Sequence, residues 1–298
     1  MSGLDRIVSA SVRRRALFAL ATSERWERAV RATRWGERVA FRRAKRYVAG
    51  TRAEDAFAYA RRLASADLAS SIDFFGESVV DPREADAVAD AYVQLVADLD
   101  RAPRAHLSLD LSHLGLDLPG EGAQARLERI AAALPSGRRI QIGAEDERRA
   151  DRILETVLAA ARGGAPVLAT VQANLIRARA DAASLAEAGV PIRLCKGAYV
   201  EDADIARPWG EPTDHAFLEL AHDLHGHGAE VVIATHDPGL REGLLRALPG
   251  LGVEMLLGVH EDDARELARR GVGVRVYVPY GDGWFRYAMR RWAESVGH

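Results

Sequence analysis

Residues 166–197, "PVLATVQANLIRARADAASLAEAGVPIRLCKG", are the stretch that decides the fold. Two short apolar runs, 166–172 and 190–197, enclose a segment at 177–188 whose apolar residues recur at helical spacing. Short runs rich in Val, Ile and Leu are typical of buried strands, and a strand–helix–strand unit of this length is typical of a parallel sheet. The stretch therefore predicts one βαβ unit.

The same unit repeats along most of the chain. The predicted strands are "SSIDFFGE" (70–77), "AHLSLDLS" (105–112), "RIQIGAE" (139–145), "PVLATVQ" (166–172), "VPIRLCKG" (190–197), "EVVIATHD" (230–237), "EMLLGVH" (254–260) and "GVRVYVP" (273–279). The predicted helices are 83–100, 122–134, 147–162, 177–188, 212–227, 238–247 and 261–270. Eight strands alternating with helices predict an α/β fold, a (β/α)8 TIM-like barrel.

A doubly wound open sheet is the alternative to a barrel. That fold usually carries a glycine-rich dinucleotide fingerprint after its first strand, and "IDFFGES" does not have it. The segment "GVGVRV" at 271–276 has only two glycines and precedes a strand instead of a helix. The barrel is therefore the favoured prediction.

Composition narrows the class of protein. The chain has 298 residues, 48% of them apolar, and a formal net charge of −2, which argues against a nucleic-acid-binding protein. Its one cysteine, Cys195, excludes an internal disulfide and favours a reducing compartment, so we predict a cytoplasmic protein. No apolar run approaches the roughly 18–20 residues of a membrane-spanning helix.

The N-terminal part differs in charge from the rest. We predict a basic helical segment at 1–65 before a catalytic barrel at 66–298, because residues 13–62 hold fifteen Arg or Lys against five Asp or Glu. Cations recur at helical spacing and apolar residues fall on another face, which predicts one amphipathic helix. The cations are Arg28, Arg31, Arg38, Arg42 and Lys45, and the apolar residues are Trp26, Val30, Ala40, Ala44 and Tyr47. The basic face is either solvated or attracted to an anionic membrane surface, as in a peripheral protein.

Polar residues gather at or just past the carboxyl ends of the predicted strands, which form the active face of a barrel. They are Asp73, Glu77, Asp110, His113, Glu145, Gln172, Asn174, Lys196, Tyr199, Glu201, Thr235, His236, Asp237, Glu254, His260, Tyr277 and Tyr280. Single polar residues at such ends also serve as caps and turns. So many together predict a functional site.

The segment "RLCKGAY" (193–199) places two cations at a strand end. Arg193 and Lys196 in a buried strand must pair with acids or with an anionic ligand, and Gly197 allows a ligand to approach the backbone. Both a ligand site and a structural ion pair fit this pattern. We predict that Cys195 faces the helix layer as a packing residue.

The C-terminal segment "YAMRRWAE" (287–294) predicts a two-faced helix. At about 100° per residue, Tyr287, Arg290, Arg291 and Glu294 share one arc. Arginine is the preferred side chain for gripping a carboxylate or phosphate with two hydrogen bonds. The pair is either a solvated face or an anion clamp that Glu294 holds in place.

Histidines raise the question of a metal-dependent barrel hydrolase. His222, His225 and His227 have an H-x2-H-x-H spacing, but they lie at a helix end, and the first strand lacks an H-x-H pair. We therefore predict no metal site.

Several motifs together resemble the proline dehydrogenase family. They are "IDFFGE", "LSHLGLDL", "VQANLIR", "VPIRLCKGAYVE", "IATHD", "EMLLGV" and "VRVYVPYGDGWFRYAMRRWAE", in the family's order over roughly residues 70–295. The resemblance implies a distorted barrel whose last helix lies over the barrel top. It also implies FAD-dependent oxidation of L-proline to 1-pyrroline-5-carboxylate, with hydride passing from ring C5 to flavin N5 and electrons passing to a quinone-type acceptor.

The resemblance further implies roles for residues. FAD would be bound non-covalently by Gln172, Arg193, Lys196, Gly197, Ala198, Thr235 and His236. Arg193, beside the flavin N5–O4 edge, and Tyr277 would act in catalysis. Arg290 and Arg291 would grip the substrate carboxylate, oriented by Glu294, and Tyr277 and Tyr287 would wall the pocket.

Two strands depart from the family pattern. Asp110 stands where the second strand usually has a lysine, and Gly143 where the third usually has an aspartate; Asn174 also departs from the pattern. An acid at 110 facing the substrate carboxylate would cost about 4 kcal/mol at 4 Å and an effective dielectric near 20. Asp110 therefore either pairs with a cation or with the substrate ammonium, or the substrate is a modified proline or another cyclic imino acid. A non-catalytic binding homologue is a further possibility.

Overall fold

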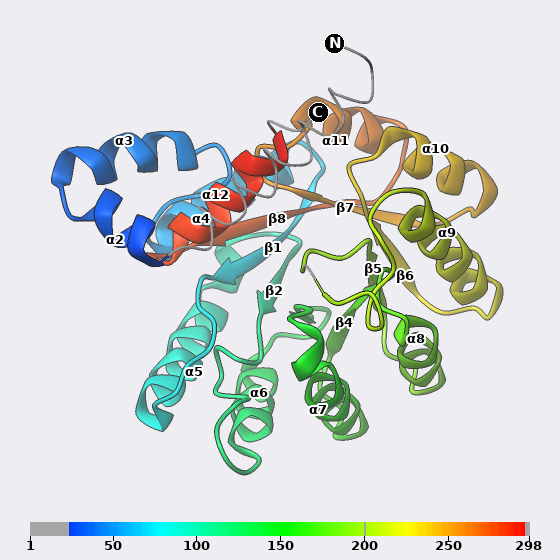
Figure 1. The fold of residues 1–298 in the computed structure, drawn as a ribbon, viewed down its shortest axis with the longest axis horizontal. Coiled ribbons are helices and arrows are strands. Elements are labelled where there is room, and N and C mark those ends of the chain that lie inside the picture. Colours follow the sequence, from blue (N-terminus) through cyan, green and yellow to red (C-terminus); the bar gives the residue numbers. More distant parts are fainter. Residues whose placement is uncertain (1–23, 200, 296–298) are drawn as a thin grey trace.

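Eight parallel strands form a closed barrel in the computed structural model, which describes residues 24–199 and 201–295 (Figure 1). The strands are β1 (Ala69–Phe74), β2 (Ala105–Leu109), β3 (Ile140–Ile142), β4 (Val167–Gln172), β5 (Ile192–Cys195), β6 (Val231–Ala234), β7 (Gly252–Leu256) and β8 (Val274–Tyr280). The barrel closes where β1 pairs with β8, with Ser71 opposite Tyr277. The predicted (β/α)8 fold is confirmed.

Helices follow the strands and cover the outside of the barrel (Figure 1). They are α5 (Pro82–Ala97), α6 (Gly122–Ala133), α7 (Ala150–Arg162), α8 (Ala178–Glu187), α9 (Glu211–Gly226), α10 (Pro238–Ala247) and α11 (Glu261–Arg269). Two short 3-10 turns precede β2 and α7, at Leu99–Arg101 and Glu147–Arg149. The helix predicted at 147–162 therefore begins as a 3-10 turn.

The seventh strand begins and ends earlier than predicted. It was expected at 254–260, but β7 spans Gly252–Leu256. Gly258 and His260 both have left-handed backbone, with φ of 74° and 50°. A strand cannot continue through such residues, so the apolar run ends as a turn.

The described part of the N-terminal segment, residues 24–65, forms three helices, α2 (Glu24–Arg31), α3 (Arg34–Ala44) and α4 (Ala53–Ser65). The prediction of one continuous basic helix through Tyr47 is wrong. Thr33 is extended, and its side chain accepts a hydrogen bond from the Gly36 N–H, so it caps a new helix. Trp26, expected on the packed face, is 46% exposed. Phe57 of α4, in contrast, is fully buried within the main core.

The last helix, α12 (Trp284–Ser295), packs against the N-terminal helices (Figure 1). Trp284 is buried against Phe41 of α3, with 5.0 Å between ring centroids. Arg286 Nε lies 3.0 Å from Glu27 Oε2 of α2. Because Arg46 also donates to the Gly258 carbonyl of the β7–α11 turn at 2.9 Å, these helices are tied to the carboxyl end of the barrel.

Candidate active site

A buried ion pair lies inside the barrel. Arg193 Nε of β5 is 2.8 Å from Glu254 Oε2 of β7, and Glu254 is only 2% exposed. The other oxygen, Oε1, accepts hydrogen bonds from Ser71 Oγ at 3.1 Å and Gln141 Nε2 at 3.0 Å. Burial opposes the charged guanidinium, but the Glu254 carboxylate raises the pKa of Arg193. Glu254, expected at the strand end, is therefore the anchor of Arg193 within the barrel.

Cys195 lies on the same side of β5 as Arg193. The prediction that it faces the helix layer is wrong, because residues two apart in a strand point to the same face. Burial raises the pKa of the Cys195 thiol, although the nearby charge of Arg193 opposes the rise. The thiol belongs to the site's surroundings instead of to the outer packing layer.

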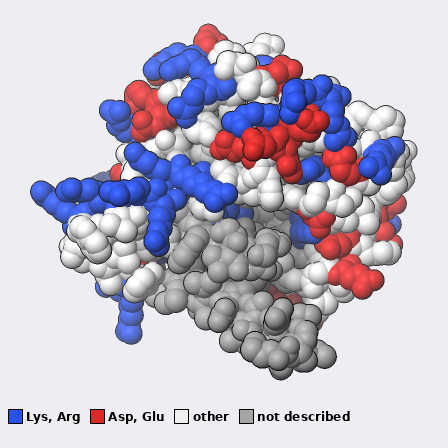
Figure 2. Space-filling model, turned by 90° about the horizontal axis from the view of Figure 1, so that it is seen from above, with Lys and Arg blue, Asp and Glu red and all other residues white. Residues whose placement is uncertain are grey.

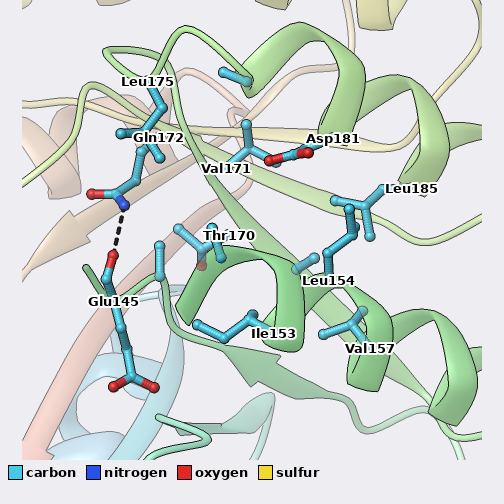
Figure 3. Close-up of a pocket in the computed structure, with 14 residues that line it drawn as sticks. Glu145, Ile153, Leu154, Val157, Thr170, Val171, Gln172, Leu175, Asp181 and Leu185 are labelled. Carbon is cyan, nitrogen blue, oxygen red and sulfur yellow. Dashed lines mark hydrogen bonds between the residues drawn. The ribbon is translucent and has the colours of Figure 1, made fainter. Parts of the chain in front are cut away.

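The ends of β4 and β5 are joined by one amide side chain. Gln172 Oε1 accepts from the Ala198 N–H at 3.2 Å, and Gln172 Nε2 donates to the Glu145 carbonyl at 2.9 Å, the bond drawn in Figure 3. Gly197, just past the end of β5, has a φ of 121°, and a Cβ there would lie 2.0 Å from Asn174 Oδ1. Both the backbone conformation and the space exclude any other residue at 197.

The ends of β5 and β6 carry the other residues of the predicted cofactor set. Lys196 Nζ is 2.6 Å from Asp214 Oδ1 and 3.4 Å from Asp237 Oδ2, so it is paired with acids in this structure. Thr235 Oγ1 accepts from the Asp237 N–H at 3.1 Å. The structure thus brings Lys196 and Thr235 to one edge of the barrel mouth.

His236 is half-buried and neutral at the same edge. Its Nε2 accepts a hydrogen bond from the Leu256 N–H at 3.2 Å, which leaves the ring proton on Nδ1. Burial, reinforced by His260 and Arg291, lowers the pKa of His236 to about 3. The Nδ1 atom is buried and has no hydrogen-bond partner within 24–199 and 201–295. A buried donor without a partner is typical of a site that a ligand completes.

Aromatic rings wall the other side of the mouth. Tyr277 of β8 and Tyr287 of α12 have ring centroids 5.8 Å apart, and Phe75 lies 5.2 Å from Tyr287. The guanidinium carbon of Arg291 lies 5.4 Å from the Tyr287 ring. The predicted pair of tyrosines is therefore brought together.

Arg290 and Arg291 of α12 both act electrostatically on residues at the barrel mouth. The charge of Arg290 opposes the rise in the pKa of Asp110, and Arg291 helps to lower that of His236. Both are therefore close to residues at the carboxyl ends of strands. The side chain of Glu294 lies outside the described side chains, so its orienting role stays a prediction.

A second buried acid, Asp73 of β1, was placed only as one of many strand-end residues. Its Oδ2 accepts from Ser108 Oγ of β2 and from the Tyr277 hydroxyl of β8, both at 3.0 Å. Burial raises the pKa of Asp73 to about 7, although these two hydrogen bonds oppose the rise. The sequence identifies Asp73 as a strand-end residue, but it does not predict the hydrogen bond from Tyr277 that links β8 to β1.

The raised pKa of Asp73 predicts how stability depends on pH. Folded Asp73 holds its proton up to about pH 7, whereas the unfolded residue loses it near the ordinary aspartate pKa of 3.8. The stabilisation is therefore complete below about pH 4 and is lost as pH rises toward 7, by up to ~1.4 kcal/mol per pH unit. We expect that the free energy of unfolding of Asp73→Asn does not fall in this way as pH rises. Urea unfolding at pH 5 and pH 8 measures it, with Asp262→Asn on the exposed face of α11 as the control; a constant gap between wild type and Asp73→Asn would contradict the expectation.

A separate opening lies outside the strands (Figure 3). The opening, about 500 Å³ including space that is open to solvent, lies among residues of β4, α7 and α8, with Ile153, Leu154 and Leu185 among its lining residues. This opening lies beside the helix layer, whereas the arginines and tyrosines described above gather at the barrel mouth. It is therefore not the candidate site.

The histidines considered as metal ligands make backbone contacts. His225 Nε2 lies 3.0 Å from the Pro249 carbonyl and His227 Nδ1 lies 2.6 Å from the Asp223 carbonyl. Across the described part of the chain, no three His, Cys, Asp or Glu residues are grouped so as to hold a metal ion.

Comparison with solved structures supports the fold. Proline utilization A from Bdellovibrio bacteriovorus, inactivated by N-propargylglycine, superposes with a TM-score of 0.78 at 17% identity. The match covers 95% of this chain and 36% of that one, so this chain spans about a third of the larger protein. At this identity the likeness shows the barrel fold alone.

Sequence comparison identifies the family. Proline dehydrogenase 1 of Bacillus subtilis (strain 168) is 33% identical over 260 residues, 84% of this chain and 86% of that protein. Proline dehydrogenase of Deinococcus radiodurans is 30% identical over 296 residues, 95% of this chain and 94% of that protein. The family model described as proline dehydrogenase matches residues 56–296. The chain therefore belongs to the proline dehydrogenase family.

Proposed function

We propose that this chain is a FAD-dependent oxidoreductase that converts L-proline to 1-pyrroline-5-carboxylate, the first step of proline catabolism. The observation that carries the proposal is the convergence of three cations on one barrel mouth. Arg193 rises from inside the barrel, while Arg290 and Arg291 reach the mouth from α12. Such a mouth suits a ligand with a carboxylate beside an electron-accepting cofactor.

The strand ends of β4, β5 and β6 fit the cofactor. The buried Nδ1–H of His236 has no acceptor within the described ranges. Gly197 has no side chain that would obstruct a ligand at the end of β5. Gln172, Lys196, Ala198 and Thr235 lie on the same edge and would complete the FAD site. FAD, when bound, supplies the oxidant that accepts the hydride from ring C5 at flavin N5.

The protein's own residues position the substrate. Arg290 and Arg291 bind its carboxylate, and the rings of Tyr277 and Tyr287 pack against its apolar ring. Arg193 keeps positive charge beside the cofactor because Glu254 holds it in place. The substrate amine must be neutral when hydride leaves, so the mouth must also accept a proton.

The electron acceptor and the location are part of the same proposal. No helix of the described ranges is both long and apolar enough to cross a bilayer. The exposed faces of α2 and α3 carry Arg25, Arg34, Arg38, Arg42 and Arg43, and Trp35 is 76% exposed beside them. Figure 2 shows these blue side chains at the left, where Figure 1 places α2 and α3. This surface suits a cytoplasmic enzyme that reaches a membrane quinone from the anionic inner face.

The experiment uses the purified holoenzyme. A flavin absorption spectrum should bleach when L-proline is added without oxygen, and a soluble quinone analogue should restore it. Sedimentation with vesicles of anionic lipid, compared with neutral lipid, measures the membrane contact. A colourless protein that carries stoichiometric zinc would instead support a metal-dependent hydrolase. If proline leaves the flavin oxidised but another cyclic imino acid bleaches it, that imino acid is the substrate in place of proline.

A further inference from the structure

Asp110 and Gly143 fit one another at the ends of β2 and β3. A Cβ at residue 143 would lie 1.9 Å from Asp110 Oδ1 and 3.1 Å from Asp110 Cγ. The carboxylate therefore leans over Gly143 and occupies the space that any larger residue would need. Gly143 is not among the residues with positive φ, and its N–H makes an ordinary 2.9 Å strand bond to the Leu109 carbonyl. Backbone conformation does not require glycine there, but the position of Asp110 does.

The surroundings of Asp110 disfavour the charged form of its side chain. Burial raises the pKa of Asp110 well above its usual range, and Glu145, Asp73 and Glu77 raise it further. Glu145 is itself buried and binds the Ser112 N–H at 2.9 Å. Arg290 is the cation that opposes these acids. No side chain of the described ranges hydrogen bonds to or forms an ion pair with the Asp110 carboxylate, which keeps some contact with the solvent at the mouth.

Asp110 in these surroundings needs a hydrogen-bond donor, and the substrate proposed above carries one. An imino acid has a negative carboxylate at one end and a nitrogen with N–H groups beside it. Arg290 lies near Asp110, so a carboxylate held by the α12 arginines would leave the adjacent nitrogen within the reach of Asp110. A hydrogen bond from N–H to a carboxylate is among the stronger neutral-to-charged contacts in proteins.

We propose that Asp110, seated over Gly143, binds the nitrogen of the substrate and makes the site selective for ring acids that carry an N–H. This inference rests on the proposed function, because it takes the carboxylate position from the arginine pair. It also accounts for an acid near a carboxylate-binding site. Asp110 offers no favourable contact to a ligand that is only an anion, and it favours one whose anion is joined to a hydrogen-bond donor.

Two planar ring acids test this selectivity without turnover. Pyrrole-2-carboxylate and furan-2-carboxylate differ in one ring atom, N–H against oxygen, and neither has a ring C–H that leaves as hydride. Binding of each to the oxidised holoenzyme is measured by calorimetry. We expect the pyrrole acid to bind at least about tenfold more tightly, the usual worth of a hydrogen bond to a charged group.

Variants of both residues should abolish the difference. Asp110→Ala should bring the two affinities to within about twofold, because the acceptor for the ring N–H is then gone. Gly143→Ala should do the same while Asp110 is still present, because the new Cβ displaces its carboxylate. Gly243→Ala, where a Cβ meets nothing within 4 Å, is the matched control and should keep the wild-type ratio. Thermal melting establishes that each variant is folded, and Asp110→Asn provides a variant of the same shape.

The outcomes separate this inference from the function it rests on. If proline bleaches the flavin but the wild type binds both acids equally, or if Asp110→Ala keeps the preference, Asp110 does not bind the nitrogen and the inference is wrong. If proline leaves the flavin oxidised and neither acid binds, the proposed function fails and the inference fails with it.

Discussion

Replacing Arg193 by methionine is expected to destabilise the folded protein by about 3–5 kcal/mol, because it leaves a buried carboxylate without its cation. Glu254 is 2% exposed, and its Oε2 would lose its 2.8 Å contact to Arg193 Nε. The hydrogen bonds from Ser71 and Gln141 reach only the other oxygen, Oε1. Urea unfolding of the purified protein at neutral pH measures the loss.

Two further variants make this prediction specific to the buried pair. Arg270→Met removes an exposed arginine that binds Glu242 through two contacts, at 2.9 and 3.0 Å, and should leave the free energy of unfolding close to that of the wild type. The double variant Arg193→Met/Glu254→Gln should recover a large part of the loss, because no buried charge is then left. Equal losses for Arg193→Met and Arg270→Met would show that Glu254 does not depend on Arg193.

The fold could be predicted because its signal is local and repeated. Each apolar run needs only to be short and bounded by polar residues, and the runs at 70–77 and 273–279 became β1 and β8. The misplaced ends have local causes that apolar content does not report. Thr33 caps a helix inside a continuous basic pattern, and left-handed backbone at Gly258 ends β7 early.

The side of a barrel strand that a residue faces was harder to predict. Strands of a parallel barrel are covered on both faces, so apolar content does not separate inside from outside. Alternation places Arg193 and Cys195 on one face, but which face it is depends on Glu254, sixty residues later. For the same reason the sequence placed Glu254 at the strand end and not within the barrel.

Contacts between distant strands were the part of the site that could not be predicted from the sequence. The α12 arginines share one short motif, so their common position was foreseeable. The hydrogen bond from Tyr277 to Asp73 joins the last strand to the first and exists only because the barrel closes. The fit of Asp110 over Gly143 is of this kind also, since each substitution is understood only beside the other.

Removing Arg291 of α12 should separate substrate binding from cofactor binding. We expect Arg291→Ala to raise the KM for L-proline by about 10–100-fold, the worth of one charge-assisted contact to a carboxylate. FAD content and the oxidised flavin spectrum should stay close to wild type, because the strand ends of β4 to β6 are untouched. Steady-state kinetics with a soluble quinone analogue give KM and kcat, and absorbance gives the flavin content.

The same helix supplies the control for that result. Arg286 lies one turn before Arg290, but it is paired with acids of the protein: its Nε lies 3.0 Å from Glu27 Oε2 and its Nη1 lies 3.7 Å from Glu77 Oε1. Arg286→Ala therefore removes an arginine from α12 without removing a ligand contact, and it should change the KM for proline by less than about threefold. Arg291→Lys should fall between alanine and wild type, because lysine keeps the charge but loses the paired hydrogen bonds. If Arg291→Ala and Arg286→Ala have the same KM, the arginines of α12 serve solubility and the carboxylate is bound elsewhere.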